Sequence, residues 1–174
     1  MTVAADVDTA EAARFASDLD APTLLDRDGA LARAFGYRAI PNGFCFGSDG
    51  RLVGSRIRGF DIREADTRAL VERWLAGSGA ETVADAASAN DPALDLFARG
   101  NARFVSGDRE AALALWHRAY LLDPDNFVIR KQIWRALYPQ RFGEPIDLAW
   151  QKAQMDREAR LGFGAANPEL PAPG

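Results

Sequence analysis

Cys45 is the only cysteine of the 174-residue chain and the residue type best suited to nucleophilic or redox chemistry. A thiolate can attack a disulfide or a peroxide, but disulfide exchange within one protein needs a second thiol. Cys45 stands between Phe44 and Phe46, in an apolar stretch that we expect to be an internal strand. A cysteine in such a strand usually acts as a small buried hydrophobic residue, so we predict a packing role.

His117 and the carboxylates are the other residues that could support acid–base or metal chemistry. His117 is the only histidine, and one histidine without a nucleophile or further ligands nearby gives neither a catalytic triad nor a metal site. We therefore expect it on a helix surface. Carboxylates alternate with arginines at helical spacing, as in Asp108-Arg109-Glu110, which is typical of solvated faces. No glycine-rich phosphate loop occurs. We predict no catalytic residue, no cofactor and no metal.

The Ile40-Pro41 pair opens a strand–turn–strand pattern. Phe44-Cys45-Phe46 forms one apolar run, and the residues from Leu52 to Ile57 form a second. Between them stands Ser48-Asp49-Gly50, a turn sequence typical of β-hairpins. The pattern predicts a hairpin with Pro41 at its entrance.

Helices are predicted on both sides of this hairpin. Leu31, Ala34 and Phe35 have helical spacing, with Gly36 placed for a left-handed C-cap. After the hairpin, Asp61 and Glu64 resemble a capping box. The apolar stripe of the helix that follows is Ile62, Ala65, Ala69, Leu70 and Trp74.

The N-terminal residues predict a strand, a helix and a second extended segment. Residues 2–7 are small, apolar and β-branched, and they precede a helix that begins at Asp8 or Thr9 and ends near Asp20. Residues 23–26 read as a short extended piece. The chain is long enough for one domain or two small ones.

Residues 2–76, taken together, resemble the thioredoxin fold, in the branch of the periplasmic thiol-disulfide reductases and peroxiredoxins. The resemblance is carried by Ile40-Pro41 as a cis-proline, by the Asp49-Gly50 turn, and by Gly59 leading into a final helix. It implies an α/β fold, a thioredoxin-like sheet with flanking helices. It also implies that Ile40, Pro41 and Gly59 form a peptide-binding site, where the backbone before the proline accepts an extended peptide.

The chain departs from this family where the chemistry would be. The family's first strand, and the helix that bears a Cys-x-x-Cys pair or a peroxidatic cysteine, have no counterpart after Met1. Without its central strand the sheet is incomplete, and it leaves unpaired edges. Three solutions exist: the chain is part of a longer protein, a second copy donates a strand, or residues 2–7 pair with the hairpin. We favour the first two.

The C-terminal half predicts helices after a small, polar linker over residues 77–91. Residues 92–160 resemble a tetratricopeptide repeat with an additional third helix and a last helix capped by Asp147. The small and large positions of that repeat are matched by Gly100, Gly107, Ala112, Trp116, Ala119 and Pro124. Phe97 stands where a clamp lysine for a partner's carboxylate would be expected. Residues 161–174 are predicted to be a disordered tail.

The balance of charged residues indicates which classes of partner are unfavourable. The 21 basic and 25 acidic residues nearly cancel, which disfavours binding to nucleic acid or to an anionic membrane. Neither a membrane-spanning run nor a signal peptide is recognised, so we expect a cytoplasmic protein.

These observations favour a catalytically incomplete thioredoxin-like protein that acts as a protein-interaction module. Its expected partner is a protein or peptide, and we expect a homodimer because an incomplete sheet seeks an edge partner. The alternative is a fragment of a thiol-disulfide oxidoreductase or peroxidase whose active-site cysteines precede Met1.

Overall fold

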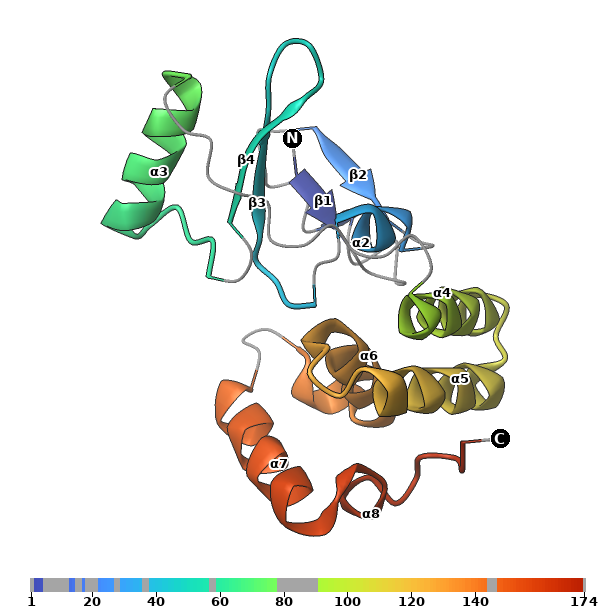
Figure 1. The fold of residues 1–174 in the computed structure, drawn as a ribbon. Helices are drawn as coiled ribbons and strands as arrows, with labels where there is room; N and C mark the ends of the chain where they lie inside the picture. The colour runs from blue at the N-terminus through green and yellow to red at the C-terminus, as the bar shows by residue number, and fades with distance from the viewer. Residues whose placement is uncertain are drawn as a thin grey trace. The chain divides into compact units, whose positions relative to one another are not determined.

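Figure 1 shows the chain as a computed structural model, which describes residues 2–4, 13–14, 17, 22–26, 29–35, 38–56, 59–77, 91–143 and 147–173. The chain divides into two units, one of residues 1–30 together with 90–174 and the other of residues 31–89. The sequence predicts a first domain over 1–76 and a linker over 77–91, so the division differs at the N-terminus. Most of the expected linker lies outside the described residues. Helices and strands are both present, which agrees with a mixed α/β class.

The first unit begins with a short parallel strand pair. Strand β1 (Thr2–Ala4) runs parallel to β2 (Thr23–Leu25), which confirms the predicted strand and the predicted extended segment. Of the helix predicted between them, the described residues Ala13, Arg14 and Ser17 are helical, and the others lie outside the described residues. Within the described residues β1 pairs with β2. Pairing of residues 2–7 with the hairpin stays one of the predicted alternatives, and residues 5–7 lie outside the described residues.

The second unit is built around the predicted hairpin. Strand β3 (Gly43–Phe46) pairs antiparallel with β4 (Leu52–Arg56), with one shift of register. In the turn, the Gly50 N–H donates to the Gly47 carbonyl oxygen at 2.9 Å. Gly50 has a φ of +77°, a left-handed conformation that favours glycine. The hairpin and its Asp-Gly turn are confirmed.

Helix α2 (Ala30–Phe35) covers one face of the hairpin. The centroid of the Phe35 ring lies 4.6 Å from that of Phe44 and 5.8 Å from that of Phe46. Alternate residues of a strand point to the same face, so these two strand residues share one face. The three rings form an aromatic row along β3.

Helix α3 (Ala65–Leu75) packs against β4. Trp74 is 5% exposed, and a β-carbon on Gly54 would overlap its indole ring. Gly54 stands opposite Cys45, whose side chain alternates with those of the aromatic row. The hairpin therefore has a helix on each of its two faces.

The predicted start of helix α3 is wrong. The helix begins after Glu64, whose side chain makes no capping hydrogen bond, and the Asp61 carboxylate instead binds Arg63. The arginine outcompetes the helix terminus because it offers the carboxylate a charged, bidentate partner. Of the predicted stripe, Leu70 and Trp74 are buried, whereas Ile62, Ala65 and Ala69 are exposed.

The first unit continues in a series of helices. They are α4 (Pro92–Val105), α5 (Arg109–Leu122), α6 (Phe127–Leu137), the 3-10 helix η1 (Pro139–Arg141), α7 (Leu148–Leu161) and α8 (Phe163–Ala166). Four of them begin at a side chain that accepts hydrogen bonds from the first turn: Asp91, Asp108, Asn126 and Asp147. Each such cap stabilises its helix by about 1 kcal/mol.

Helices α4 and α5 form a helix–turn–helix pair (Figure 1). Trp116 is fully buried, and its Nε1–H donates to Asn101 Oδ1 at 3.0 Å and to the Phe97 carbonyl oxygen at 3.2 Å. A β-carbon on Gly100 would overlap the indole ring. The small and large positions of the pair pack as predicted, and its assignment as a tetratricopeptide repeat stays a prediction.

The prediction of a disordered tail over residues 161–174 is wrong for the described residues up to 173. Helix α8 follows Gly162, and Phe163, Ala166 and Asn167 are all buried. The Asn167 side chain donates to the Phe163 carbonyl oxygen at 2.8 Å. The segment is rich in proline, which favoured the prediction of disorder. Its contacts with the preceding helices nevertheless give it a defined structure.

No helix in the described part of the chain is long and apolar enough to cross a membrane.

We predict that Gly100→Ala destabilises the first unit. The added methyl group must displace the Trp116 ring, and overpacking of this kind costs about 1–3 kcal/mol. A gain in helix propensity of about 1 kcal/mol offsets part of the loss. Urea unfolding followed by tryptophan fluorescence measures the difference. The matched control is Gly143→Ala, where the added group meets open space. Equal stability of the two variants would contradict the packing.

Candidate peptide-binding site

The structure brings the predicted site residues together at the entrance of the hairpin. The peptide bond between Ile40 and Pro41 is cis. The Phe60 N–H donates to the Pro41 carbonyl oxygen at 3.2 Å, which joins the loop before β3 to the segment that follows β4. Gly59 directly precedes Phe60, has a φ of +65° and is exposed. Ile40, Pro41 and Gly59 thus belong to two segments held by one backbone hydrogen bond.

Ile40 offers both an apolar side chain and a main chain to solvent. Its side chain is 57% exposed, which is unusual for a large aliphatic residue next to a strand. None of the hydrogen bonds of the described residues involves the Ile40 main chain. An extended peptide lying here could therefore gain both backbone hydrogen bonds and apolar contact.

Phe60 fixes this site to the rest of the second unit. Its ring stacks on Trp74 with centroids 6.2 Å apart. The ring also lies against Gly43, where a β-carbon would overlap it. Phe60 was not predicted to belong to the site. The only sequence feature that connects Phe60 with the site is its position directly after Gly59.

Asp61 and Arg63 close the turn after Gly59. The Asp61 carboxylate accepts from the Arg63 main-chain N–H at 2.9 Å, and Arg63 Nη2 donates to Oδ2 at 2.6 Å. The side-chain hydrogen bond from Arg63, followed by its backbone hydrogen bond, lowers the pKa of Asp61 to about 2. The Asp61 N–H in turn donates to the Gly59 carbonyl oxygen at 3.0 Å. This clasp shapes the exposed side of the site.

Cys45 and His117 do not belong to the site. Cys45 is free and half-buried in β3, so it is less enclosed than predicted. The prediction that His117 lies on a helix surface is wrong, because it is 7% exposed. Its Nδ1 hydrogen-bonds to the Pro171 carbonyl oxygen at 2.8 Å, and its ring faces Phe163. The segment after α7 therefore covers the His117 ring. No local sequence pattern predicts this contact. No group of three potential metal ligands occurs within the described residues.

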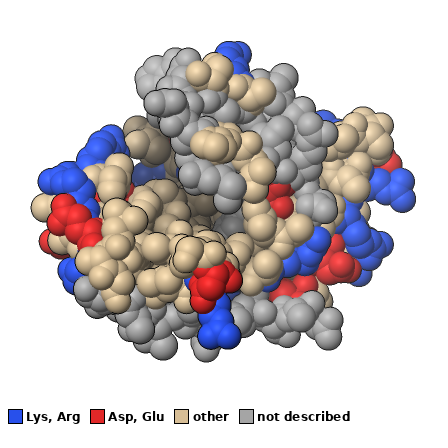
Figure 2. All heavy atoms as spheres, turned by 90° about the horizontal axis from the view of Figure 1, so that it is seen from above, with Lys and Arg blue, Asp and Glu red and all other residues tan. Residues whose placement is uncertain are grey.

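Charged residues of both signs are intermingled on the face drawn in Figure 2. Blue arginines and lysines stand beside red aspartates and glutamates among the described residues shown there. The expectation that nucleic acid and anionic membranes are not partners stays a prediction.

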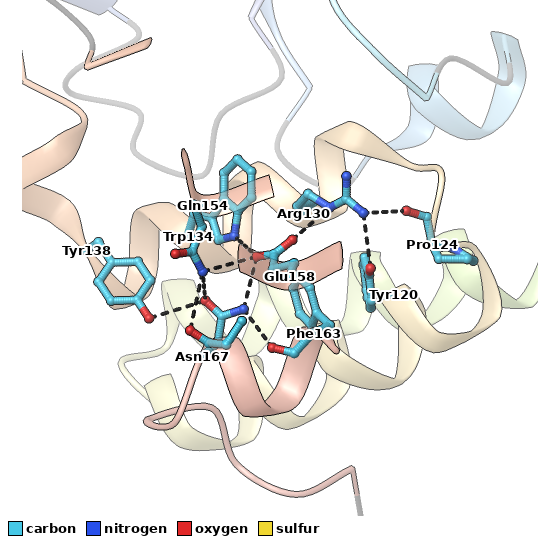
Figure 3. Close-up of polar contacts among 10 residues, drawn as sticks. Tyr120, Pro124, Arg130, Trp134, Tyr138, Gln154, Glu158, Phe163 and Asn167 are labelled. Carbon is cyan, nitrogen blue, oxygen red and sulfur yellow. Dashed lines mark hydrogen bonds and ion pairs between the residues drawn. The ribbon is translucent and has the colours of Figure 1, made fainter. Parts of the chain in front are cut away.

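A second polar constellation, in the first unit, is centred on Glu158 (Figure 3). The Glu158 side chain is 4% exposed. Its Oε1 accepts from Trp134 Nε1 at 2.6 Å, from Asn167 Nδ2 at 3.0 Å and from Gln154 Nε2 at 3.3 Å. Three donors from three segments thus converge on one carboxylate oxygen.

The second oxygen of Glu158 faces a cation. Arg130 Nε lies 3.4 Å from Glu158 Oε2, and Arg130 Nη2 donates to the Tyr120 hydroxyl at 3.0 Å and to the Pro124 carbonyl oxygen at 3.2 Å. Tyr138 also joins the cluster, donating to Asn167 at 3.2 Å, and burial raises its pKa.

We interpret the Glu158 cluster as structural. Its hydrogen bonds connect α6 to α7 and to the segment after α8, and each carboxylate oxygen is directed at protein groups. From the sequence the carboxylates were expected to be solvated, and burial of Glu158 was not predicted. A glutamate that alternates with arginines on a helix gives no sign of which of them is buried.

Comparison of the chain with protein-family models, with curated proteins and with solved structures gives no match. The candidate site is therefore defined by the geometry at Ile40, Pro41 and Gly59.

We predict that Arg63→Gln raises the pKa of Asp61 from about 2 toward 3.8. Because the folded-state pKa is lowered, the stabilising effect of the clasp is fully present above the unfolded pKa and is lost as the pH falls through about 2. Titration of the Asp61 carboxyl carbon by NMR measures both values. Arg51→Gln is the matched control, since Arg51 pairs with Asp49. An Asp61 pKa that does not differ between the two variants would contradict the clasp.

We also predict that Glu158→Gln destabilises the first unit by about 3 kcal/mol, because it removes the buried counter-charge of Arg130, whose side chain is 20% exposed. Asp156→Asn makes the same chemical change on the exposed side of α7 and should alter stability by less than about 0.5 kcal/mol. Guanidinium unfolding followed by circular dichroism compares the two. A Glu158→Gln protein as stable as Asp156→Asn would show that the cluster contributes little.

Proposed function

We propose that this chain is a thioredoxin-like protein-interaction module that binds an extended segment of a partner at Ile40, Pro41 and Gly59. The proposal is carried by one observation. At Ile40, three residues before β3 begins, a large aliphatic side chain is exposed, and the main chain of this residue has no hydrogen bond among those of the described residues.

The geometry around this residue supports recognition by strand addition. In that mode an extended peptide forms main-chain hydrogen bonds with an open sheet edge, and side-chain contacts give specificity. The described hairpin has two strands, so β3 is paired on the β4 side only within the described residues. The Phe60 anchor and the Asp61–Arg63 clasp hold the loop in one conformation, which reduces the entropy lost on binding.

A binding function is also consistent with the chemistry of the chain. Thiol–disulfide exchange of the thioredoxin type uses two thiols, and Cys45 is the only cysteine in the 174 residues. It lies within β3, five residues after Ile40. The site therefore presents apolar surface and backbone groups, and no nucleophile.

The helical unit has a supporting part in this proposal. Its α4–α5 pair resembles a tetratricopeptide repeat, a class that often binds peptides. Phe97, at the position of a clamp lysine, is 6% exposed and packs near Trp116. A buried aromatic residue cannot hold a partner's carboxylate, so we assign the peptide site to the hairpin unit.

We predict that Ile40→Glu weakens peptide binding at least about tenfold. Removing an aliphatic contact costs about 1.5–3 kcal/mol when the side chain is fully buried by the partner, which corresponds to roughly one to two orders of magnitude in affinity. Peptides selected from a random displayed library against the wild-type chain are synthesised, and their affinities are measured by calorimetry for the wild type and the variant.

The matched control is Leu75→Glu, which makes the same kind of change at an exposed leucine of α3. It should bind the selected peptides as the wild type does. Failure to select any peptide, or an equal effect of the two substitutions, would refute the site.

A further inference from the structure

The segment after Gly162 lies against the helices that precede it, and we call residues 163–173 the C-terminal arm. The arm contains α8 and a tight turn, in which the Leu170 N–H donates to the Asn167 carbonyl oxygen at 2.9 Å. Asparagine followed by proline is a common way to begin such a turn. Phe163 and Asn167 are buried. The arm is thus attached to the helices through particular side chains.

The Asn167 carboxamide uses its full hydrogen-bonding capacity against groups of α6, α7 and α8 (Figure 3). Its Nδ2 donates to Glu158 Oε1 at 3.0 Å and to the Phe163 carbonyl oxygen at 2.8 Å. Its Oδ1 accepts from Gln154 Nε2 at 2.9 Å and from the hydroxyl of Tyr138, directly after α6, at 3.2 Å. A carboxamide has two N–H donors and an oxygen that accepts twice. The receiving side therefore fits asparagine, whereas an aspartate would place a second carboxylate against Glu158.

Two further contacts attach the arm to α5. The Tyr120 ring stacks on the Phe163 ring with centroids 3.6 Å apart. The His117 Nδ1–H donates to the Pro171 carbonyl oxygen at 2.8 Å, and because a carbonyl oxygen only accepts, the proton is on Nδ1. Apart from the contact within the arm itself, the polar and aromatic partners of the arm all come from residues that precede it.

Gly162 alone connects the arm to α7. Its φ of +82° and ψ of 154° lie in a backbone region that is essentially restricted to glycine. Gly162 is exposed, and a β-carbon there would meet nothing within 4 Å. Its conformation is therefore not imposed by packing at the hinge itself.

The hydrogen bonds of Gly162 are compatible with a different direction of the arm. The Gly162 N–H donates to the Glu158 carbonyl oxygen at 2.8 Å, and the Gly162 carbonyl oxygen accepts from the Ala166 N–H at 3.0 Å. Both bonds have the four-residue spacing of an α-helix. If the dihedral angles of Gly162 become helical, both bonds are retained, and α7 and α8 join into one helix that carries the arm away from its own receiving side.

We propose that two copies of this chain exchange their arms, with Gly162 as the hinge, so that Asn167 of one copy binds Glu158 of the other. The second copy has the same residues 163–173, so the contacts of the closed chain form again between the two copies. The receiving side needs no additional free surface, because an identical arm already occupies it in the closed chain. Exchange of an identical element is a low-cost route to a dimer. The site at Ile40 takes no part in it.

The balance between the closed chain and the exchanged dimer depends on the hinge and on concentration. The contacts of the arm are the same in both, so they do not favour either. Association costs translational and rotational entropy, which favours the closed chain at low concentration. Joining α7 to α8 gives helical hydrogen bonds to carbonyl groups that the end of α7 otherwise leaves without intrahelical partners. Glycine adopts the closed conformation without steric cost, so the wild type should be mainly closed when dilute.

Gly162→Ala should shift the chain to the exchanged dimer. Alanine is strained in the closed hinge conformation but is a good helix former. We expect the dissociation constant of the dimer to fall at least about tenfold relative to the wild type. In light scattering after size exclusion, the mass should move from 18.9 kDa toward twice that value.

The matched control is Gly164→Ala, in the arm itself. Gly164 has no positive φ, and its added methyl group meets only the His117 ring at 4.0 Å, an ordinary contact. This variant should remain as monomeric as the wild type.

The wild type provides a test that does not depend on the folding of a variant. When it is kept concentrated near the midpoint of its thermal unfolding and then cooled, part of it should be dimeric. The arm must leave its site before the chain can close again, so this dimer should persist after dilution. A second heating at low concentration should return it to the monomer.

Complementary variants distinguish arm exchange from association through another surface. In the Gly162→Ala background, Asn167→Ala makes the arm defective, and Glu158→Gln makes the receiving side defective. A mixed dimer contains one site in which Asn167 and Glu158 are both present. When the two proteins are refolded together, part of the mixture should therefore unfold at a higher temperature than either protein alone, as measured by circular dichroism.

Three results would overturn the exchange. The first is a wild type that contains no dimer after the concentrated heating, and the second is a Gly162→Ala chain that is monomeric at every concentration. The third is a mixture of the complementary variants that unfolds as the sum of its two components, because a dimer formed through another surface gains nothing from mixing.

Discussion

Close contact between an aromatic ring and a glycine is the constraint on which both units depend. In the second unit, Phe60 lies over Gly43 and Trp74 over Gly54. In the first unit, Trp116 occupies the space beside Gly100. In each case the ring fills the volume that a β-carbon would need. Backbones can then approach closely, and one large side chain buries much apolar area.

These contacts also explain how the candidate site is held. The Phe60 ring is fixed between Gly43 and Trp74, and its own N–H binds the Pro41 carbonyl oxygen. A strand, a loop and a helix thereby meet at one residue. The exposed Ile40 does not need to be held by its own side chain, because the carbonyl group of the next residue is tied down. The site is rigid in its backbone and free in its apolar contact surface.

The sequence predicts those parts of the fold that depend on interactions between residues close together in the chain. The Asp49-Gly50 turn marks the hairpin, and Asp147 marks the start of α7, because turns and caps are made by side chains a few positions from the backbone they bind. Gly100 and Trp116 lie farther apart, but their sizes follow a recognisable repeat spacing.

The failures have a common physical cause. Glu158, His117 and Asn167 are buried by contacts with segments that no local pattern identifies, and all three have polar side chains that normally face water. The capping box at Asp61 failed for the opposite reason, because a nearby arginine provided a stronger partner than the helix. In the candidate site the resemblance located Ile40, Pro41 and Gly59. The anchoring role of Phe60 depends on Gly43 and Trp74, which the sequence alone did not connect to it.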